Sequence, residues 1–326
     1  MKKILIIQTA FLGDAILATA LAETLHKNAE NEISILVRKG NESLFKGHPF
    51  LKEVMVWDKK NNKLNNLLAI INQVRNKKYD AVINLQRFFS TGLITGFSGA
   101  AARIGFDKNP LSFLFTRTVK HLIGDGRHEV ARNLELIGQD ASLPLQRPVL
   151  YPQPSDLEAI AQCRHVPYVC MAPASVWFTK QLPTEKWVEL IKKIPQQIAV
   201  YLIGGPGDKT LCENIKELSG RKQVFNLAGT TGYLATAALM REAKMNFVND
   251  SGPLHIASAV NAPVTAFFCS TLPAFGFGPL SDSSVIIETS EKLVCRPCGL
   301  HGKNSCPLGH FHCGTTIQIP SVEYLS

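Results

Sequence analysis

The stretch MNFVNDSGPLHIASAVNAPVTAFF, residues 245–268, indicates the fold class more clearly than any other part of the chain. Two short apolar runs flank a polar turn and a segment with helical spacing of apolar residues. The predicted elements are a buried strand over 246–248, a turn over 249–252, a helix over 253–260 and a second strand over 264–268. A strand–helix–strand unit of this kind builds a parallel sheet in an α/β protein.

The polar turn of this unit is a candidate binding site. Pro253 suits the first turn of a helix, and Gly252 lets a ligand approach the backbone closely. The N–H groups at a helix N-terminus attract phosphate oxygens, and His255 lies within the same turn. Asp250 or Ser251 is expected to cap the helix with its side chain. Capped turns also occur in α/β proteins without a ligand, so the turn alone leaves both interpretations open.

Length and composition indicate a folded protein of two domains with an anionic partner. The 326 residues exceed what one hydrophobic core usually serves, and 45% of them are hydrophobic. The formal net charge of +9 favours a nucleotide, a nucleic acid or an acidic membrane surface as partner. Lys and Arg are scattered and no nucleic-acid-binding motif is present, so we expect no nucleic-acid partner.

The N-terminus has some features of a secretory signal peptide, because two lysines precede an apolar run. Asp14 in that run argues against secretion, since a carboxylate is costly to insert into a membrane. The same residues fit a strand over 3–8, a loop and a helix over 14–25. No later segment has the roughly 20 uninterrupted apolar residues of a membrane span. We therefore expect a cytoplasmic protein whose membrane contact, if any, is peripheral.

Strands and helices alternate on both sides of a proline-rich break at 143–156, which suits a linker between domains. The expected strands lie at 33–37, 54–57, 81–85, 102–106, 168–172, 199–204 and 224–227. The expected helices lie at 64–75, 184–194, 209–218 and 233–241, and another should begin after Pro320, its remainder beyond the last residue. This alternation predicts two Rossmann-like, doubly wound domains, 1–152 and 153–326, that face a cleft. Loops 9–14, 173–180, 204–208 and 249–252 should line that cleft.

The dinucleotide-binding fingerprint G-x-G-x-x-G is absent from both halves. The first loop, QTAFLGD at residues 8–14, has one glycine where the fingerprint needs three. A Rossmann dehydrogenase is therefore not expected. Two α/β domains without the fingerprint instead favour the GT-B arrangement of nucleotide-sugar enzymes.

Five motifs carry a resemblance to a known family. They are FLGDAILATALAETL (11–25), PASVWFTKQLPTEKW (173–187), LIGGPGD (202–208), NLAGTTGYL (226–234) and NDSGPLHIASAVNAPVTAFF (249–268). Together they resemble glycosyltransferase family 9, the lipopolysaccharide heptosyltransferases, and especially its heptosyltransferase II subgroup. The resemblance implies inverting transfer of heptose from ADP-heptose to a sugar hydroxyl of the anionic lipopolysaccharide inner core. It also implies peripheral attachment to the cytoplasmic face of the inner membrane.

The resemblance assigns two catalytic roles. Asp14 matches the base that takes the proton of the acceptor hydroxyl, and Lys180 matches the cation that neutralises charge on the departing ADP. The residues by themselves leave alternatives, because Asp14 could cap its helix and Lys180 could be a solvated surface lysine. Ser175, in the same loop as Lys180, is expected to donate a hydrogen bond to phosphate.

Further positions match the nucleotide-sugar site of the family. Asp208 corresponds to an acidic group near the ribose or base, with helix capping as the alternative. Asp250 is expected to hold its turn or to contact sugar hydroxyls, because a carboxylate repels phosphate. Ser251, Gly252 and nearby backbone N–H groups would then hold the diphosphate, with His255 beside it.

Four cysteines, Cys295, Cys298, Cys306 and Cys313, fall within 19 positions. Reduced thiols are the first expectation for a cytoplasmic protein, and a structural zinc ion is the alternative, although the spacing is irregular for a zinc knuckle. The transfer reaction implied by the resemblance needs no metal and no cofactor besides the sugar nucleotide. Two other functions fit the same architecture: a nucleotide-sugar epimerase and a noncatalytic nucleotide-binding protein.

Overall fold

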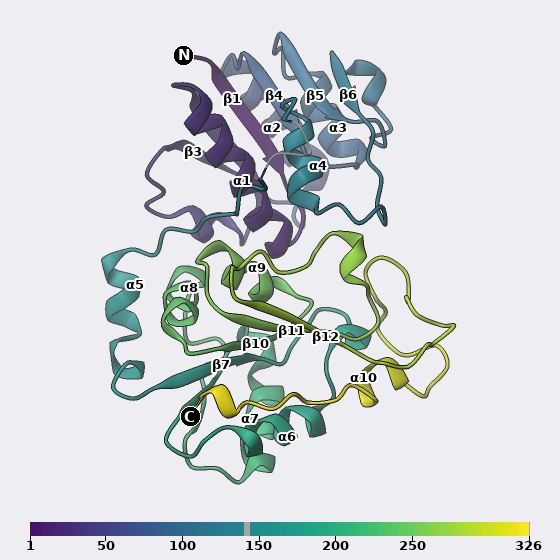
Figure 1. Cartoon of the computed structure of the whole chain (residues 1–326). Helices are drawn as coiled ribbons and strands as arrows, with labels where there is room; N and C mark the ends of the chain where they lie inside the picture. Colours follow the sequence, from purple (N-terminus) through teal and green to yellow (C-terminus); the bar gives the residue numbers. More distant parts are fainter. Residues whose placement is uncertain (140–143, 326) are drawn as a thin grey trace. The chain divides into compact units, whose positions relative to one another are not determined.

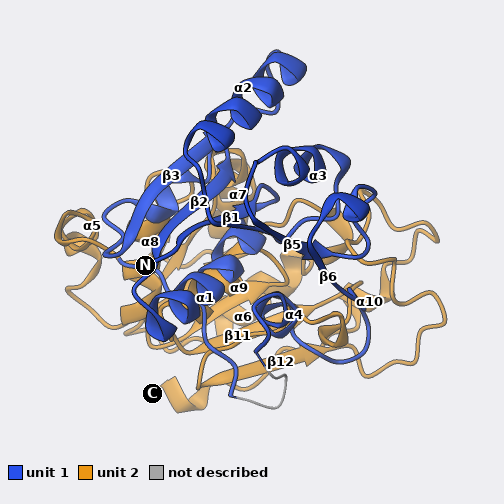
Figure 2. Ribbon diagram, turned by 90° about the horizontal axis from the view of Figure 1, so that it is seen from above, with its two compact units in different colours: residues 1–151 blue, residues 152–326 orange. Residues whose placement is uncertain are grey.

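The computed structural model describes residues 1–139 and 144–325, which form two compact units (Figures 1 and 2). Unit 1 is Met1–Tyr151 and unit 2 is Pro152–Ser326, a division one residue from the expected domain boundary. Leu143, the first residue of the expected linker, lies outside the described residues. The linker is not free of helix, because α5 (Pro154–Ala159) begins within it. Pro154 occupies the start of α5, where its missing N–H costs nothing.

Unit 1 is built on six parallel strands in the order β3-β2-β1-β4-β5-β6. Helices α2 and α3 lie on one face of this sheet, and α1 and α4 lie on the other (Figure 2). Both faces are therefore covered, which explains why β1 and β2 are buried along nearly their whole length. The strands are β1 (Lys3–Gln8), β2 (Glu32–Arg38), β3 (Leu51–Trp57), β4 (Ala81–Asn84), β5 (Ala102–Phe106) and β6 (Arg117–Val119). The helices are α1 (Leu12–Asn28), α2 (Lys63–Asn76), α3 (Phe89–Gly96) and α4 (Glu129–Glu135).

Unit 2 repeats this topology, with six parallel strands in the order β12-β11-β10-β7-β8-β9 (Figure 1). Trp187 of α6 and Ile215 of α7 are buried together with β-strand side chains such as Phe247. The strands are β7 (Tyr168–Ala172), β8 (Ala199–Leu202), β9 (Val224–Asn226), β10 (Asn246–Asn249), β11 (Val264–Phe268) and β12 (Ser284–Glu288). The helices after α5 are α6 (Thr184–Lys193), α7 (Lys209–Ser219), α8 (Tyr233–Glu242), α9 (Gly252–Ala259) and α10 (His312–Thr315).

The predicted doubly wound parallel fold is confirmed in both units, and each sheet has the strand order 3-2-1-4-5-6 of Rossmann domains. The sequence did not predict α3, whose FSTGLITG composition is poor in strong helix formers. Gly92 of α3 is required by packing, because a Cβ there would lie 2.3 Å from Asn109 Oδ1. The helix expected to begin after Pro320 is seen within the described residues only as the short 3₁₀ helix Glu323–Leu325. Through residues 1–139 and 144–325, no helix is long and apolar enough to cross a membrane.

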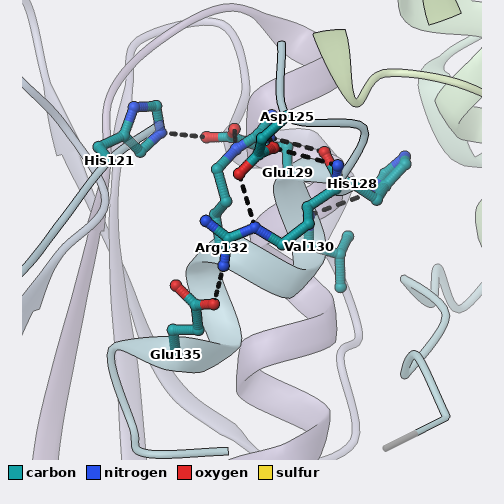
Figure 3. Close-up of polar contacts among 8 residues, drawn as sticks. His121, Asp125, His128, Glu129, Val130, Arg132 and Glu135 are labelled. Carbon is teal, nitrogen blue, oxygen red and sulfur yellow. Dashed lines mark hydrogen bonds and ion pairs between the residues drawn. The ribbon is translucent and has the colours of Figure 1, made fainter. Parts of the chain in front are cut away.

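A buried network of charged side chains fixes the segment around the start of α4 (Figure 3). The Arg132 guanidinium is fully buried, and its Nε lies 2.8 Å from Glu129 Oε2. His121 Nε2 lies 3.4 Å from Glu129 Oε1, and Arg132 Nη1 lies 3.4 Å from Asp125 Oδ1. Burial raises the pKa of Glu129, but His121 and Arg132 outweigh it and hold that pKa below its ordinary value. No pattern in the sequence indicated this network, which links three segments of unit 1.

Candidate active site

The point where the strand order reverses in unit 2 lies between β7 and β10, which are neighbours in the sheet. In sheets of this topology, ligands bind outside the carboxyl ends of the strands at that point. Asn249, the last residue of β10, donates a 2.7 Å hydrogen bond to Pro173 O and accepts a 3.0 Å hydrogen bond from Leu182 N–H. These bonds join the loop after β7 to the turn after β10. The third expected loop of unit 2, residues 204–208, follows β8, which is the other neighbour of β7 in the sheet. The three loops therefore follow adjacent strands.

Lys180 and Asp250 form an ion pair at this edge of the sheet. Lys180 Nζ lies 2.7 Å from Asp250 Oδ2, and the Thr271 hydroxyl donates a 2.6 Å hydrogen bond to the same oxygen. The side chain of Lys180 is 15% exposed and that of Asp250 is 6% exposed. Lys180 is therefore not a solvated surface lysine. Asp250 holds the ammonium in place, a role that the sequence did not suggest.

Helix α9 begins at Gly252 without a side-chain cap. Ser251 is the N-cap residue in extended conformation, but its side chain makes no capping hydrogen bond. The Ser251 hydroxyl instead lies 3.4 Å from Asn249 O, and the Asp250 carboxylate is occupied by Lys180 and Thr271. The predicted side-chain cap is therefore wrong. N–H groups at the start of a helix without a side-chain cap can donate hydrogen bonds to a bound anion.

The remaining residues predicted for the nucleotide site lie on α9 and on the loops after β7 and β8. His255 is 5% exposed, and its ring contacts the edge of Phe277 with centroids 6.3 Å apart. Asp208 Oδ2 accepts a 2.7 Å hydrogen bond from Gly205 N–H, so this carboxylate stabilises its own turn and makes no side-chain cap on α7. Ser175 O accepts a 2.7 Å hydrogen bond from Gln181 Nε2, which fixes the loop that carries Lys180.

The cysteine segment, residues 295–313, packs against the turn that presents Lys180. Thr179 is 1% exposed, and its hydroxyl accepts hydrogen bonds from Lys303 N–H at 2.8 Å and from the Ser270 hydroxyl at 2.9 Å. Thr179 N–H donates a 3.1 Å hydrogen bond to Lys303 O. A Cβ on Gly302 would lie 3.0 Å from Lys180 Cγ, so the Gly302 backbone lies closely against the Lys180 side chain. This contact joins residues more than 100 positions apart, and no sequence pattern predicted it.

Unit 1 has polar groups at the equivalent point of its own sheet, after β1. Asp14 lies in the first turn of α1, whose N-cap residue is Phe11. Lys59, just beyond the end of β3, donates a 2.8 Å hydrogen bond to Thr9 O. Burial, together with the nearby charge of Arg38, lowers the pKa of Lys59 to about 8. No sequence pattern singled out Lys59, although its position two residues after a strand could have suggested it.

The two doubly wound sheets, one in each unit, match the GT-B fold of solved heptosyltransferase structures. The sequence profile of "Glycosyltransferase family 9 (heptosyltransferase)" matches residues 67–305. The chain therefore belongs to glycosyltransferase family 9. This membership confirms the family predicted from the five motifs.

Curated relatives and solved structures cover most of the chain. Lipopolysaccharide heptosyltransferase 3 of Escherichia coli is 27% identical over 278 residues, which are 80% of this chain and 82% of that protein. The structure of E. coli ADP-heptose lipopolysaccharide heptosyltransferase II superposes with a TM-score of 0.77 at 24% identity, over 92% of each chain. An E. coli heptosyltransferase solved with ADP-2-deoxy-2-fluoro heptose gives a TM-score of 0.70 at 20% identity, over 88% of this chain and 93% of that one.

Proposed function

We propose that this protein transfers heptose from ADP-heptose to a sugar hydroxyl of the lipopolysaccharide inner core, with inversion at the anomeric carbon. The observation that carries the proposal is Lys180, held by a buried carboxylate at the strand ends of unit 2, where a diphosphate would bind. Unit 2 would bind the donor and unit 1 the acceptor. We further propose that the enzyme works at the cytoplasmic face of the inner membrane as a peripheral protein.

The proposed reaction is a single displacement. The acceptor oxygen attacks the anomeric carbon while the bond from that carbon to the diphosphate oxygen breaks, and Asp14 takes the acceptor proton. Lys180 and the N–H groups at the start of α9 offset the negative charge that develops on the departing ADP. This scheme requires no metal ion. Ser175, Ser251 and Gly252 would contact the diphosphate.

The remaining site residues have secondary roles in the proposal. His255 would lie beside the diphosphate, and Asp208 would accept a hydrogen bond from a ribose hydroxyl with the carboxylate oxygen that Gly205 does not use. Asp250 acts through Lys180, since its Oδ2 already accepts from that ammonium and from Thr271. Asp250 is therefore a positioning residue.

A transfer assay with truncated lipopolysaccharide acceptors tests the proposal. Relatives of similar identity carry the names heptosyltransferase 1, 2 and 3, so the acceptor set should include Kdo2-lipid A and its forms with one and two heptoses. We expect heptose transfer from ADP-heptose to one of these acceptors, with heptosyl-Kdo2-lipid A favoured by the resemblance to heptosyltransferase II. Altered or released sugar without an acceptor would instead identify an epimerase.

Calorimetry distinguishes an enzyme of this kind from a protein with another ligand. We expect ADP to bind and UDP to bind at least tenfold more weakly, a difference of about 1.4 kcal/mol. Binding of ADP without transfer to any acceptor would favour the noncatalytic alternative. If neither nucleotide binds, the proposed donor is wrong.

We propose that the Lys59 ammonium also binds the anionic acceptor. Lys59→Met is then expected to raise the acceptor KM at least tenfold, because a hydrogen bond to a charged group contributes roughly 1.5–3 kcal/mol. Since the pKa of Lys59 is about 8, the ammonium is charged below that pH and loses its charge above it. The wild-type acceptor KM should therefore rise between pH 7 and pH 9, and the variant should lose this dependence. Lys60→Met, which removes an exposed neighbouring charge, is the control. An unchanged pH profile in Lys59→Met would contradict a role in acceptor binding.

A further inference from the structure

The cysteine segment encloses a cavity of about 250 Å³. All four cysteines of the segment, Cys295, Cys298, Cys306 and Cys313, are among the residues that line this cavity. The remaining four cysteines are buried elsewhere in unit 2, at positions 163, 170, 212 and 269. None of the four thiols that line the cavity is in a disulfide. Packing accounts for Cys313, which is in the core of unit 2, and for Cys306 beside it, but not for Cys295 and Cys298, which are only partly buried.

The backbone around Cys306 is folded to support a thiolate. Phe311 N–H donates to Cys306 Sγ at 3.4 Å, and Gly309 N–H donates to Cys306 O at 3.1 Å. Phe311 has a φ of +47°, a left-handed conformation that is costly for a bulky side chain. This conformation is part of a tight turn whose N–H points at sulfur, which is a weak acceptor as a thiol and a stronger one as a thiolate. Hydrogen bonds to the ligands are a regular feature of metal sites.

We infer that Cys295, Cys298, Cys306 and Cys313 bind one zinc ion. Four thiolates at about 2.3 Å in a tetrahedron form a closed structural zinc site. Each thiol gives its proton to solvent when it binds, so loading releases up to four protons. His310 Nε2 lies 3.9 Å from Cys295 Sγ, where it can donate a hydrogen bond to the bound thiolate.

Zinc binding requires the thiols to turn into the cavity. In the parts of the chain that the structure describes, no three His, Cys, Asp or Glu side chains are arranged to hold a metal ion. Rotation of a cysteine side chain between staggered positions moves its sulfur without moving the backbone. Since all four side chains already line one cavity, side-chain rotation and small loop shifts are the changes that we infer.

The inferred zinc ion would stabilise the donor site of unit 2. Arg296 lies between two of the cysteines, and it donates a 2.7 Å hydrogen bond to Thr271 O and a 2.6 Å hydrogen bond to Cys269 O. Thr271 in turn bonds to Asp250, the partner of Lys180. The cysteine segment thereby contacts Thr271 through Arg296 and Lys180 through Gly302. This consequence for donor binding rests on the proposed function, whereas zinc binding itself does not.

Metal analysis of the whole protein tests the inference. Protein loaded with zinc under reducing conditions and passed through gel filtration is expected to retain about one zinc ion per chain. Cys298→Ser/Cys306→Ser should retain none above the buffer blank, and Cys163→Ala, altered outside the segment, should retain as much as wild type. A chelator should lower the Tm of the wild type and leave the double variant unchanged, because a ligand of the folded state stabilises it.

Three outcomes would overturn the inference: wild type without zinc after loading, bound iron in place of zinc, or zinc retained by the double variant. The wild-type measurement stands even if the double variant fails to fold. ADP titration of the zinc-loaded and chelated wild type separates the two proposals. If the protein binds zinc but not ADP, the proposed function is contradicted and the metal site is not. If it binds ADP but not zinc, the metal site is contradicted and the proposed function is not. Weaker ADP binding after chelation is the expected result.

Discussion

Asp14→Asn is expected to lower kcat about 10²- to 10⁴-fold, the usual contribution of a general base. The substitution keeps the shape of the side chain and removes its ability to take a proton. Because Asp14 lies in the first turn of α1, loss of its charge also removes a favourable interaction with the helix dipole, about 0.3–1 kcal/mol of stability. This loss is too small to unfold a protein of ordinary stability. ADP affinity, measured by calorimetry, should stay within a factor of two because Asp14 acts on the acceptor.

Glu30→Gln is the matched control for Asp14→Asn. Glu30 is an exposed carboxylate of the same unit, just beyond the other end of α1. Its neutralisation changes the net charge by the same amount and is expected to leave kcat within a factor of two. Turnover of Asp14→Asn within threefold of wild type would show that another group takes the proton. Equal losses in both variants would point to a charge effect instead of base catalysis.

The fold was predictable because the hydrophobic periodicity and the positions of turn-forming residues indicated the same strands and helices along the chain. Strands such as β7 and β11 are continuous apolar runs, as parallel sheets buried on both faces require. The same alternation in both halves predicted two doubly wound sheets. It also placed the candidate residues on loops after strands, where ligands of such sheets bind.

The contacts within the site were less predictable, because periodicity shows which face a side chain occupies and not which polar group it meets. Lys180 and Asp250 are 70 positions apart and follow different strands. Each was evident as a candidate, but their ion pair depends on the adjacency of β7 and β10. The bond between Lys59 and Thr9 likewise depends on two separate strand ends of unit 1. The helix cap was mispredicted because the tertiary ion pair with Lys180 engages Asp250, and a local hydrogen bond to Asn249 O engages the Ser251 hydroxyl.

Lys180→Met is expected to lower kcat/KM about 10²- to 10³-fold, the usual cost of removing one group that stabilises developing negative charge. It also leaves the Asp250 carboxylate buried without its cation, which should lower the free energy of unfolding by about 3 kcal/mol. Thr271 still donates to Asp250 and offsets part of this loss. Chemical denaturation and steady-state kinetics measure the two effects. Lys192→Met, on the exposed side of α6, should change the free energy of unfolding by less than about 0.5 kcal/mol.

Lys180→Met/Asp250→Asn separates the two roles of the ion pair. An asparagine keeps an acceptor for the Thr271 hydroxyl and carries no charge, so most of the lost stability should return. Activity should remain as low as in the single variant, because the cation for the departing ADP is still missing. Recovery of both stability and activity would show that Lys180 only neutralises Asp250. Low activity in a stable double variant supports the ammonium as the group that acts on the diphosphate, with Asp250 as the residue that positions it.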